Sequence, residues 1–336
     1  MKHLCLVAAK SGGHILPCLT LAQQYQPDYT TFIASQSILD RTITKQPFIN
    51  KNIYLSLINV PYKKPYLLPI FLGQLFYSWL KMLHYFIANR PEKIVSTGSY
   101  VAIPVVFAGF LLRIPIELWE LNVVPGKTIK WLTPFATTIK ICFKETVNYL
   151  KNNKCELASY PLLYTDNDKT SQEKALNTLN FDPKKITLFI LGGSQGSQEL
   201  NSHVSSLLVQ QPMLTNKIQI IHQTGSDNLE IMEKFYATHH ISAHVFGYKS
   251  YLAPFYNAAD LVISRAGAGA LAELSFFEKE TVLIPLIIKE NNHQYYNALA
   301  KSQESPNTFH TLTMQDDNFY TKTIKLITDI VRFKSL

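Results

Sequence analysis

The chain has 336 residues, 47% of them hydrophobic and 17% charged, with a formal net charge of +8. This length suffices for two globular domains, and the composition excludes a low-complexity or disordered chain. The charge predicts an anionic partner, either an anionic membrane surface or an anionic substrate. Nucleic acid is the least favoured partner, because the basic residues are scattered and no nucleic-acid-binding motif accompanies them.

The four cysteines lie far apart, with no Cys-x-x-Cys pair. This pattern predicts structural thiols in a reducing compartment. The first residues enter an apolar strand directly and show no signal-peptide cleavage pattern, so we expect the protein in the cytoplasm.

The apolar run from Leu4 to Ala9 predicts a strand, and helical spacing begins at Ile15. Between them lies a turn made of Lys10, Ser11, Gly12, Gly13 and His14. A strand, a glycine turn and a helix aim backbone N–H groups at an anion, but the spacing fits neither a Walker A loop nor a dinucleotide fingerprint. Two interpretations of His14 stay open: a general base in the neutral form, or a residue that caps or lines the turn.

The segment from Val60 to Phe86 carries apolar residues at helical spacing. A core helix is the favoured interpretation. A membrane-surface element is the second, and the two are compatible. A transmembrane helix is the least favoured, because polar residues interrupt the apolar run. The predicted membrane-facing residues are Lys63, Lys64, Leu67, Leu68, Phe71, Leu72 and Trp79.

Further strands are predicted at 29–34, 52–57, 93–97, 114–119 and 138–143, the last of these closing the first half. Ligands of open α/β sheets gather outside the carboxyl ends of the strands. We therefore expect His14, Tyr100, Glu120 and Asn122 in one neighbourhood. The hydrophobic pattern weakens after residue 152, and we place the domain boundary near Pro161, giving domains 1–160 and 161–336. Whether the last helix packs on the second domain or returns to the first stays open.

The second half is organised around Leu188 to Asn201, where an apolar run enters the turn Gly192 to Gly196. A diphosphate site and an ordinary strand–helix turn are equally compatible with this stretch alone. A third glycine-rich turn follows the strand predicted to end at Ser264. His240 and His244 have i, i+4 spacing, but no nearby carboxylate or cysteine supports a metal site. The alternation of strands and helices in two blocks predicts two doubly wound, Rossmann-like α/β domains facing each other across a cleft.

Several motifs occur together in one order: Ser11 to Pro17, Thr97 to Tyr100, Glu120 to Asn122, Gly192 to Gly196 with Asn201, His222 to Gly225, Ser264 to Ala268 with Glu273, and His293-Gln294. This set resembles the MurG family over almost the whole chain. These are inverting GT-B glycosyltransferases that move N-acetylglucosamine (GlcNAc) from UDP-GlcNAc to lipid I and form lipid II for peptidoglycan. The resemblance implies UDP-GlcNAc and lipid I, an undecaprenyl-diphosphate-linked acceptor, as substrates, an anionic membrane surface as partner, and no cofactor or metal. It places the protein peripherally on the cytoplasmic face of the cell membrane.

The resemblance implies His14 as the general base and Lys10, Tyr100 and Glu120 on the acceptor side. The residues implied in binding UDP-GlcNAc are Ser11, Gly12, Gly13, Asn122, Ser194, Gln195, Ala268, Gly269, Ala270, Leu271, Ala272, Glu273 and Gln294. Glu273 is suited to accept hydrogen bonds from ribose hydroxyls, and Gln294 to recognise GlcNAc hydroxyls.

The chain departs from the family pattern at several positions. The first loop reads Ala9-Lys10-Ser11 where the family has Gly-Gly-Thr, and an arginine expected near Tyr160 to Leu163 is missing. These departures keep alternatives open. One is a related lipid-linked glycosyltransferase or a UDP-GlcNAc epimerase of the same fold. The other is a non-catalytic homologue that binds membrane or nucleotide.

Overall fold

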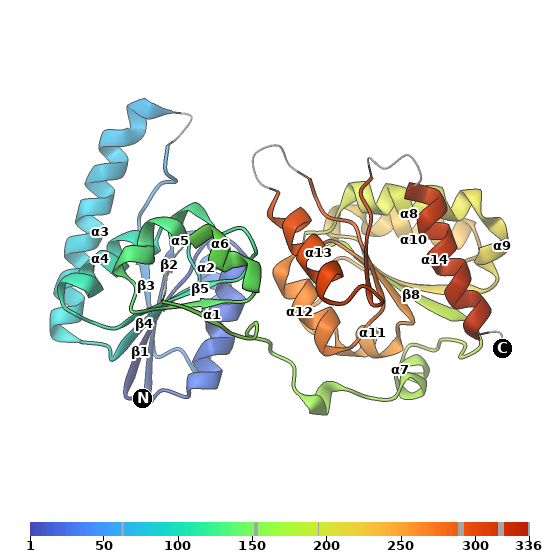
Figure 1. Cartoon of the computed structure of the whole chain (residues 1–336), viewed down its shortest axis with the longest axis horizontal. Helices are drawn as coiled ribbons and strands as arrows, with labels where there is room; N and C mark the ends of the chain where they lie inside the picture. Colours follow the sequence, from blue (N-terminus) through green and yellow to red (C-terminus); the bar gives the residue numbers. More distant parts are fainter. Residues whose placement is uncertain (62–63, 151–153, 194, 288–291, 315–318, 335–336) are drawn as a thin grey trace. The chain divides into compact units, whose positions relative to one another are not determined.

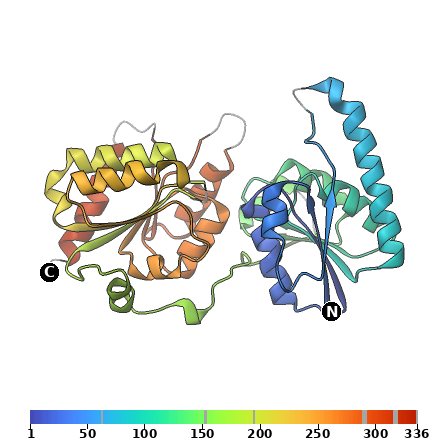
Figure 2. The ribbon, with the colours of Figure 1, turned by 180° about the vertical axis from the view of Figure 1, so that it is seen from behind.

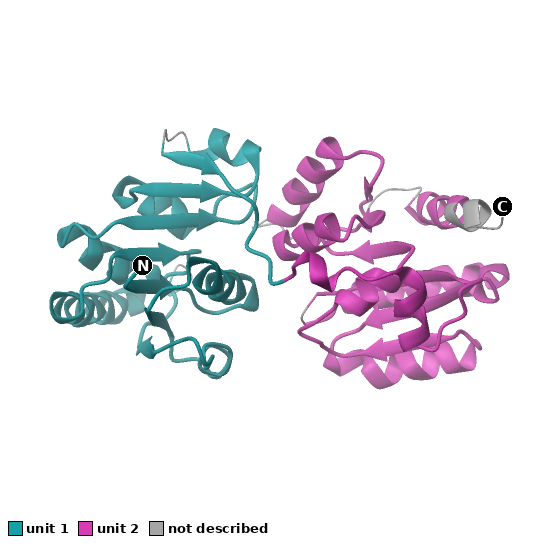
Figure 3. Cartoon of the chain, turned by 90° about the horizontal axis from the view of Figure 1, so that it is seen from below, with its two compact units in different colours: residues 1–163 teal, residues 164–336 magenta. Residues whose placement is uncertain are grey.

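The computed structural model describes residues 1–61, 64–150, 154–193, 195–287, 292–314 and 319–334. The chain forms two compact units, residues 1–163 and 164–336 (Figure 3). Each unit buries its own hydrophobic core around its own parallel sheet. The change from one unit to the other falls between Leu163 and Tyr164.

The first unit is built on seven strands: β1 His3–Val7, β2 Tyr29–Ser35, β3 Lys51–Leu55, β4 Lys93–Ser96, β5 Ile116–Glu120, β6 Thr138–Ile141 and β7 Cys155–Leu157. They form one sheet in the order β3-β2-β1-β4-β5-β6-β7, with every neighbouring pair parallel. We expected β6 to close this half, and that expectation is wrong, because β7 pairs with β6 at the edge. The segment Cys155-Glu156-Leu157 is short and half exposed, so it has none of the continuous apolar pattern of a buried parallel strand.

The helices of this unit are α1 Gly12–Tyr25, α2 Ile38–Ile43, α3 Leu68–Ala88, α4 Ala102–Leu111, α5 Lys127–Leu132 and α6 Val147–Leu150. Figures 1 and 2 show α1 and α3 on opposite sides of the sheet. On the α3 side, Phe86, Val105 and Leu132 share one core with Val7 and Ile94 of the sheet. The two faces are therefore covered as a doubly wound fold requires.

Helix α3 is apolar on more than its core-facing side. Phe71, Met82 and Phe86 are buried, whereas Leu72 and Phe76 are 51% and 60% exposed. The prediction of a core helix is confirmed, but its apolar stripe is wider than the core needs. Among the described residues, no helix combines the length and the apolar character that a bilayer crossing requires, α3 included.

The second unit is built on six strands: β8 Ile186–Leu191, β9 Ile218–Gln223, β10 Ala243–Phe246, β11 Leu261–Ser264, β12 Thr281–Leu283 and β13 Phe309–Thr311. Their order is β10-β9-β8-β11-β12-β13, again with parallel pairs throughout. Sequence analysis missed the two edge strands β10 and β13, which are short and carry partly exposed histidines at His244 and His310. Edge strands need little apolar surface, so their hydrophobic pattern is weak.

The helices of the second unit are α7 Gln172–Thr178, α8 Gln198–Gln210, α9 Pro212–Thr215, α10 Leu229–Thr238, α11 Ala253–Ala258, α12 Ala268–Phe276, α13 His293–Glu304 and α14 Phe319–Lys334. On one face, Val204 of α8, Tyr236 of α10 and Ile327 of α14 join the core of β8. On the other face, Phe189 of β8 packs against Phe255 and Tyr256 of α11. The last helix thus packs on the second unit.

Candidate functional site

In the first unit, the strand order changes direction between β1 and β4. The chain passes from β1 to β2 and β3 on one side, then crosses to β4 on the other. Ligands of open α/β sheets bind at such a switch point, outside the carboxyl ends of the strands. Lys10 to His14 follow β1 here, and Tyr100 follows β4. The structure therefore brings together the first-loop and Tyr100 residues that the sequence placed in one neighbourhood.

His14 lies in the first turn of α1 and is fixed by Thr97 from the end of β4. The Nδ1 atom of His14 lies 2.9 Å from the backbone oxygen of Thr97, and the hydroxyl of Thr97 donates to the backbone oxygen of His14 at 2.8 Å. A carbonyl oxygen only accepts, so Nδ1 carries the proton. The neutral ring then keeps its lone pair on Nε2, which is the form that a general base needs.

Lys10 adopts a left-handed backbone conformation, with φ of 77°. This conformation costs a residue other than glycine about 1 kcal/mol. The N–H of Lys10 donates to Oδ1 of Asp40 at 2.9 Å, and Asp40 is fully buried. The ammonium group of Lys10 lies 4.5 Å from the ring centroid of Tyr100, within cation–π range. Asp40 thus holds the backbone of the first loop, while Tyr100 supports its side chain.

Glu120, the last residue of β5, is buried and shapes the loop that follows. Its Oε1 accepts from the N–H of Asn122 and its Oε2 from the N–H of Gly126, both at 2.9 Å. Burial raises the pKa of Glu120 to about 7, against the effect of these hydrogen bonds. The carboxyl group thus supports the loop that carries Asn122, at the end of the strand that pairs with β4.

The second unit repeats the arrangement, with its switch point between β8 and β11. Here the backbone of the turn after β8 packs against the backbone of the turn after β9. A Cβ atom on Gly196 would lie 2.1 Å from the oxygen of Thr224, and one on Gly225 would lie 2.4 Å from the oxygen of Gln195. Both glycines also have positive φ, 73° and 81°. Only glycine allows this approach, which brings the start of α8 to the edge of the sheet.

Arg265 connects the turns after β8 and β11. It is 6% exposed, and its guanidinium donates to the hydroxyl of Ser197 from Nε at 3.1 Å and from Nη2 at 2.8 Å. It also donates to the backbone oxygen of Ile284 at 3.1 Å and to Glu199 at 2.7 Å. Ser197 is the N-cap of α8, so Arg265 fixes the start of that helix against the start of α12.

A buried chain of hydrogen bonds supports the contact between the turns after β8 and β9. The side chain of His222 contacts the hydroxyl of Tyr236 at 2.8 Å and Oδ1 of Asn201 at 3.1 Å, and Asn201 donates to the backbone oxygen of Thr224 at 3.0 Å. Burial lowers the pKa of His222 to about 3, so the ring is neutral at physiological pH. Asn201 accepts from Nε2–H, which leaves Nδ1 to accept from Tyr236.

The first turn of α12 offers small, partly exposed side chains from Ala268 to Ala270 after the N-cap Gly267. Glu273, one turn further, accepts from the hydroxyl of Tyr256 at 2.7 Å, and burial raises its pKa to about 7. Gln294 lies in the first turn of α13, and its Oε1 accepts from the N–H of Leu286 at 3.0 Å. These residues follow the adjacent strands β11 and β12, so they lie along one edge of the second sheet.

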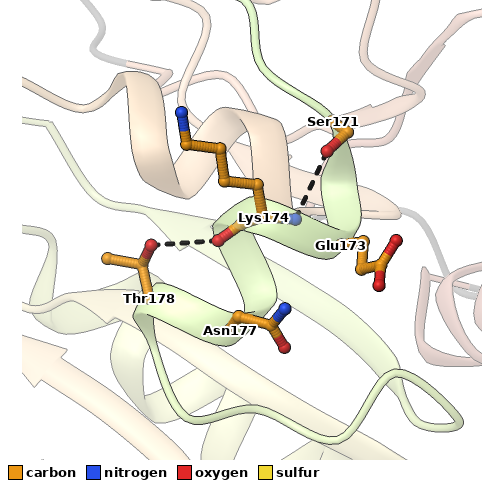
Figure 4. Close-up of a pocket in the computed structure, with 5 residues that line it drawn as sticks. All are labelled: Ser171, Glu173, Lys174, Asn177 and Thr178. Atoms are coloured by element: carbon orange, nitrogen blue, oxygen red, sulfur yellow. Dashed lines mark hydrogen bonds between the residues drawn. The ribbon is translucent and has the colours of Figure 1, made fainter.

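Two predicted site residues, Ser194 and Lys63, lie outside the described residues. The remaining ones divide between the two units. Within the part of the chain that the structure describes, no group of three or more His, Cys, Asp or Glu residues has the arrangement of a metal site, and His244 contacts Lys249 instead. A hollow of about 560 Å³ beside α7 is lined by Ser171, Glu173, Lys174, Asn177 and Thr178 and contains none of the predicted site residues (Figure 4).

Sequence reasoning missed the supporting roles of Asp40 and Arg265. A signal for Asp40 was present, because Ser37 and Asp40 have the spacing of a helix N-cap and the hydroxyl of Ser37 accepts from the N–H of Asp40 at 3.1 Å. Nothing in the sequence linked Asp40 to Lys10, thirty positions earlier. Arg265 belongs to the motif from Ser264 to Ala268, but its contact with Ser197 depends on the parallel pairing of β8 with β11.

Comparisons with known proteins agree with this geometry. The glycosyltransferase family 28 N-terminal domain matches residues 4–141, and the C-terminal domain of that family matches residues 187–314. Two relatives carry the name UDP-N-acetylglucosamine–N-acetylmuramyl-(pentapeptide) pyrophosphoryl-undecaprenol N-acetylglucosamine transferase. The one from Thermodesulfovibrio yellowstonii is 31% identical, with 86% of this chain and 79% of the relative covered. The one from Synechocystis sp. is 32% identical, with 88% and 79% covered.

A solved structure, that of Acinetobacter baumannii MurG, has the same fold, with a TM-score of 0.74 at 22% identity over 98% of this chain and 91% of that one. The two doubly wound units, matched by the two domains of glycosyltransferase family 28, make this chain a GT-B glycosyltransferase. The chain belongs to the MurG family within glycosyltransferase family 28. The predicted fold class and family are confirmed.

Proposed function

We propose that this protein transfers GlcNAc from UDP-GlcNAc to the undecaprenyl-diphosphate-linked acceptor lipid I, with inversion at the anomeric carbon, and so forms lipid II for peptidoglycan. The observation that carries the proposal is the pair of family domains over both units, each with its glycine turn at a switch point. The names of the relatives supply the two substrates.

His14 is the proposed base. Its Nε2 takes the proton of the acceptor hydroxyl while the hydroxyl oxygen attacks the anomeric carbon and the bond to UDP breaks. The contact of Nδ1 with the Thr97 oxygen supports this role, because it selects the neutral tautomer with Nε2 unprotonated. Gly12 and Gly13 begin α1, and the N–H groups of a first helical turn have no helical acceptor. They are suited to a diphosphate next to the base.

The UDP part is proposed to bind at the second switch point. The starts of α8 and α12 offer N–H groups and the positive ends of two helix dipoles to the diphosphate as it leaves. Glu273 accepts from the ribose hydroxyls, and Gln294 contacts the hydroxyls of GlcNAc, as the family resemblance implies. Arg265 and the chain of Tyr236, His222 and Asn201 keep the two turns in place.

The test is a transfer assay with the purified protein, labelled UDP-GlcNAc and a lipid I analogue. We expect lipid II and free UDP in equal amounts. UDP without a lipid product would identify a hydrolase, and an epimerised sugar nucleotide an epimerase. Either result contradicts the proposal, as does donor binding without turnover.

We further propose that the protein acts peripherally on the cytoplasmic face of the membrane, through an apolar groove between α3 and α4. The groove has a volume of about 510 Å³ and is lined by Leu72, Leu75, Phe76, Trp79, Pro104, Phe107, Phe110, Leu111 and Phe135. Several of its side chains are strongly exposed, including Phe76 at 60% and Leu111 at 59%. An exposed apolar surface of this kind marks an interaction site, and the net charge of +8 favours an anionic leaflet.

Of the predicted membrane residues, Leu72 and Trp79 line this groove, Lys64 and Leu68 are exposed, Leu67 is half-buried, and Phe71 is buried in the core. We expect Phe76→Glu to reduce binding to anionic vesicles at least tenfold in a sedimentation assay. Ile87→Glu is the matched control, because Ile87 is 67% exposed on the same helix but outside the groove. Equal binding by both variants and the wild type would contradict the proposed contact.

A further inference from the structure

Lys10 holds a backbone conformation that glycine would adopt at no cost. Its φ of 77° falls in the left-handed region. The conformation is held by the buried carboxylate of Asp40, which accepts from the N–H of Lys10 at 2.9 Å and from the N–H of Ser35 at 3.0 Å. The loop is therefore locked to β2 by a charged group that is 0% exposed.

The side chain of Lys10 lies over the ring of Tyr100. Its ammonium group lies 4.5 Å from the ring centroid of Tyr100. The ring is itself anchored, because the Tyr100 hydroxyl donates to the backbone oxygen of Leu57 at 3.1 Å. Among the described residues, no carboxylate lies within salt-bridge distance of the ammonium group. The ammonium group of Lys10 thus stands at the end of β1 beside the ring of Tyr100, in the same turn as His14.

We propose that Lys10 binds the diphosphate of the acceptor, and that the strained loop is kept because it places the ammonium group there. The inference rests on the proposed function, which puts a diphosphate-linked acceptor beside His14. An ammonium group is a suitable point charge for a phosphate oxygen. Support by an aromatic ring reduces the side-chain freedom lost on binding. Lys10 acts in binding and takes no proton in the reaction.

The test separates charge from strain with three variants. Lys10→Met removes the charge and keeps the strained backbone, and Lys10→Gly removes both. Lys10→Arg keeps both. We expect the KM for the lipid I analogue to rise about tenfold in the first two and to stay within threefold in the third, with the KM for UDP-GlcNAc unchanged. We also expect the glycine variant to unfold about 2 °C above the wild type, because the strain is relieved.

Gln26→Gly is the matched control. Gln26 is exposed at the far end of α1, also with positive φ, 46°. The Gln26→Gly variant should be more stable than the wild type, with no change in the KM for the lipid I analogue or for UDP-GlcNAc. Two results would overturn the proposal without contradicting the transferase activity. One is an unchanged KM for the lipid I analogue in Lys10→Met, and the other is a rise in that variant confined to the KM for UDP-GlcNAc. If the wild type forms no lipid product, the proposed function fails and this inference with it.

Discussion

The backbone oxygen of Thr97 accepts from Nδ1 of His14 at 2.9 Å, and the hydroxyl of Thr97 donates to the backbone oxygen of His14. This double contact joins the first turn of α1 to the end of β4. It determines both the position of the imidazole and the nitrogen that carries its proton. A ring held in this way is ready to accept a proton at Nε2 without first changing its tautomer.

His14→Ala should lower kcat at least a hundredfold and leave the Kd for UDP-GlcNAc within about threefold. The reason is that the base acts on the acceptor hydroxyl, whereas the UDP part is proposed to bind at the starts of α8 and α12 in the other unit. Steady-state kinetics and calorimetry would measure the two quantities. His239→Ala, at an exposed histidine, serves as the control. A near-wild-type kcat in the first variant would rule out His14 as the base.

Gly196→Ala and Gly193→Ala form a matched pair in the turn after β8. Both glycines have positive φ, but a Cβ on Gly196 would meet the oxygen of Thr224 at 2.1 Å, whereas one on Gly193 meets nothing within 4 Å. We expect a loss in the free energy of unfolding of about 1 kcal/mol for Gly193→Ala and at least about 3 kcal/mol for Gly196→Ala. Urea titrations would measure both. Equal losses would show that the backbone contact is unimportant.

Arg265→Met should weaken UDP binding about tenfold, because it removes the two hydrogen bonds that hold Ser197 and the start of α8. Glu199→Gln removes another partner of the same guanidinium, but Glu199 is 58% exposed, so this variant should bind UDP within about threefold of the wild type. Calorimetry with UDP gives both values. Unchanged affinity in Arg265→Met would mean that the two turns hold their geometry without the arginine.

His203 makes the stability of the second unit depend on pH. It packs against Phe319 and Tyr320, and burial lowers its pKa to about 4. The neutral ring is favoured in the folded state, so its full contribution is present above pH 6.5 and is lost as the pH falls towards 4. Between pH 7 and pH 5 this loss is about 2 kcal/mol.

The informative measurement is the difference between His203→Phe and the wild type. Glu273, whose pKa burial raises to about 7, changes stability in the opposite direction over the same interval. Urea unfolding at pH 7 and pH 5 should show a pH effect that differs by about 2 kcal/mol between the two proteins, with the variant losing less. Identical pH effects would contradict the assigned pKa of His203.

The architecture could be predicted from the sequence because buried parallel strands are continuous apolar runs. Leu4 to Ala9 and Ile186 to Leu191 were recognisable in this way, and so were the glycine turns after them. The edge strand β7 could not be recognised, because a half-exposed strand of three residues needs no such pattern. The spacing of hydrophobic residues in a sequence reflects burial, and an edge strand such as β7 is little buried.

The candidate site was predictable where a turn places residues by itself, as at Lys10 to His14. It was not predictable where residues meet through strand pairing, as do Lys10 with Asp40 and Arg265 with Ser197. The left-handed backbone of Lys10 is an instructive case. The family resemblance expects a glycine in this part of the loop, and the structure retains the conformation of a glycine while the residue has changed.

The contact between Gly196 and Gly225 has an evolutionary consequence. A Cβ atom on either glycine would clash with the backbone of the turn that contains the other glycine. A larger residue at one position therefore cannot be compensated by a smaller residue at the other. Glycine is already the smallest residue, and the clash is with main chain. No substitution at these two positions is therefore tolerated. Lineages that retain this turn should keep both glycines while neighbouring positions vary.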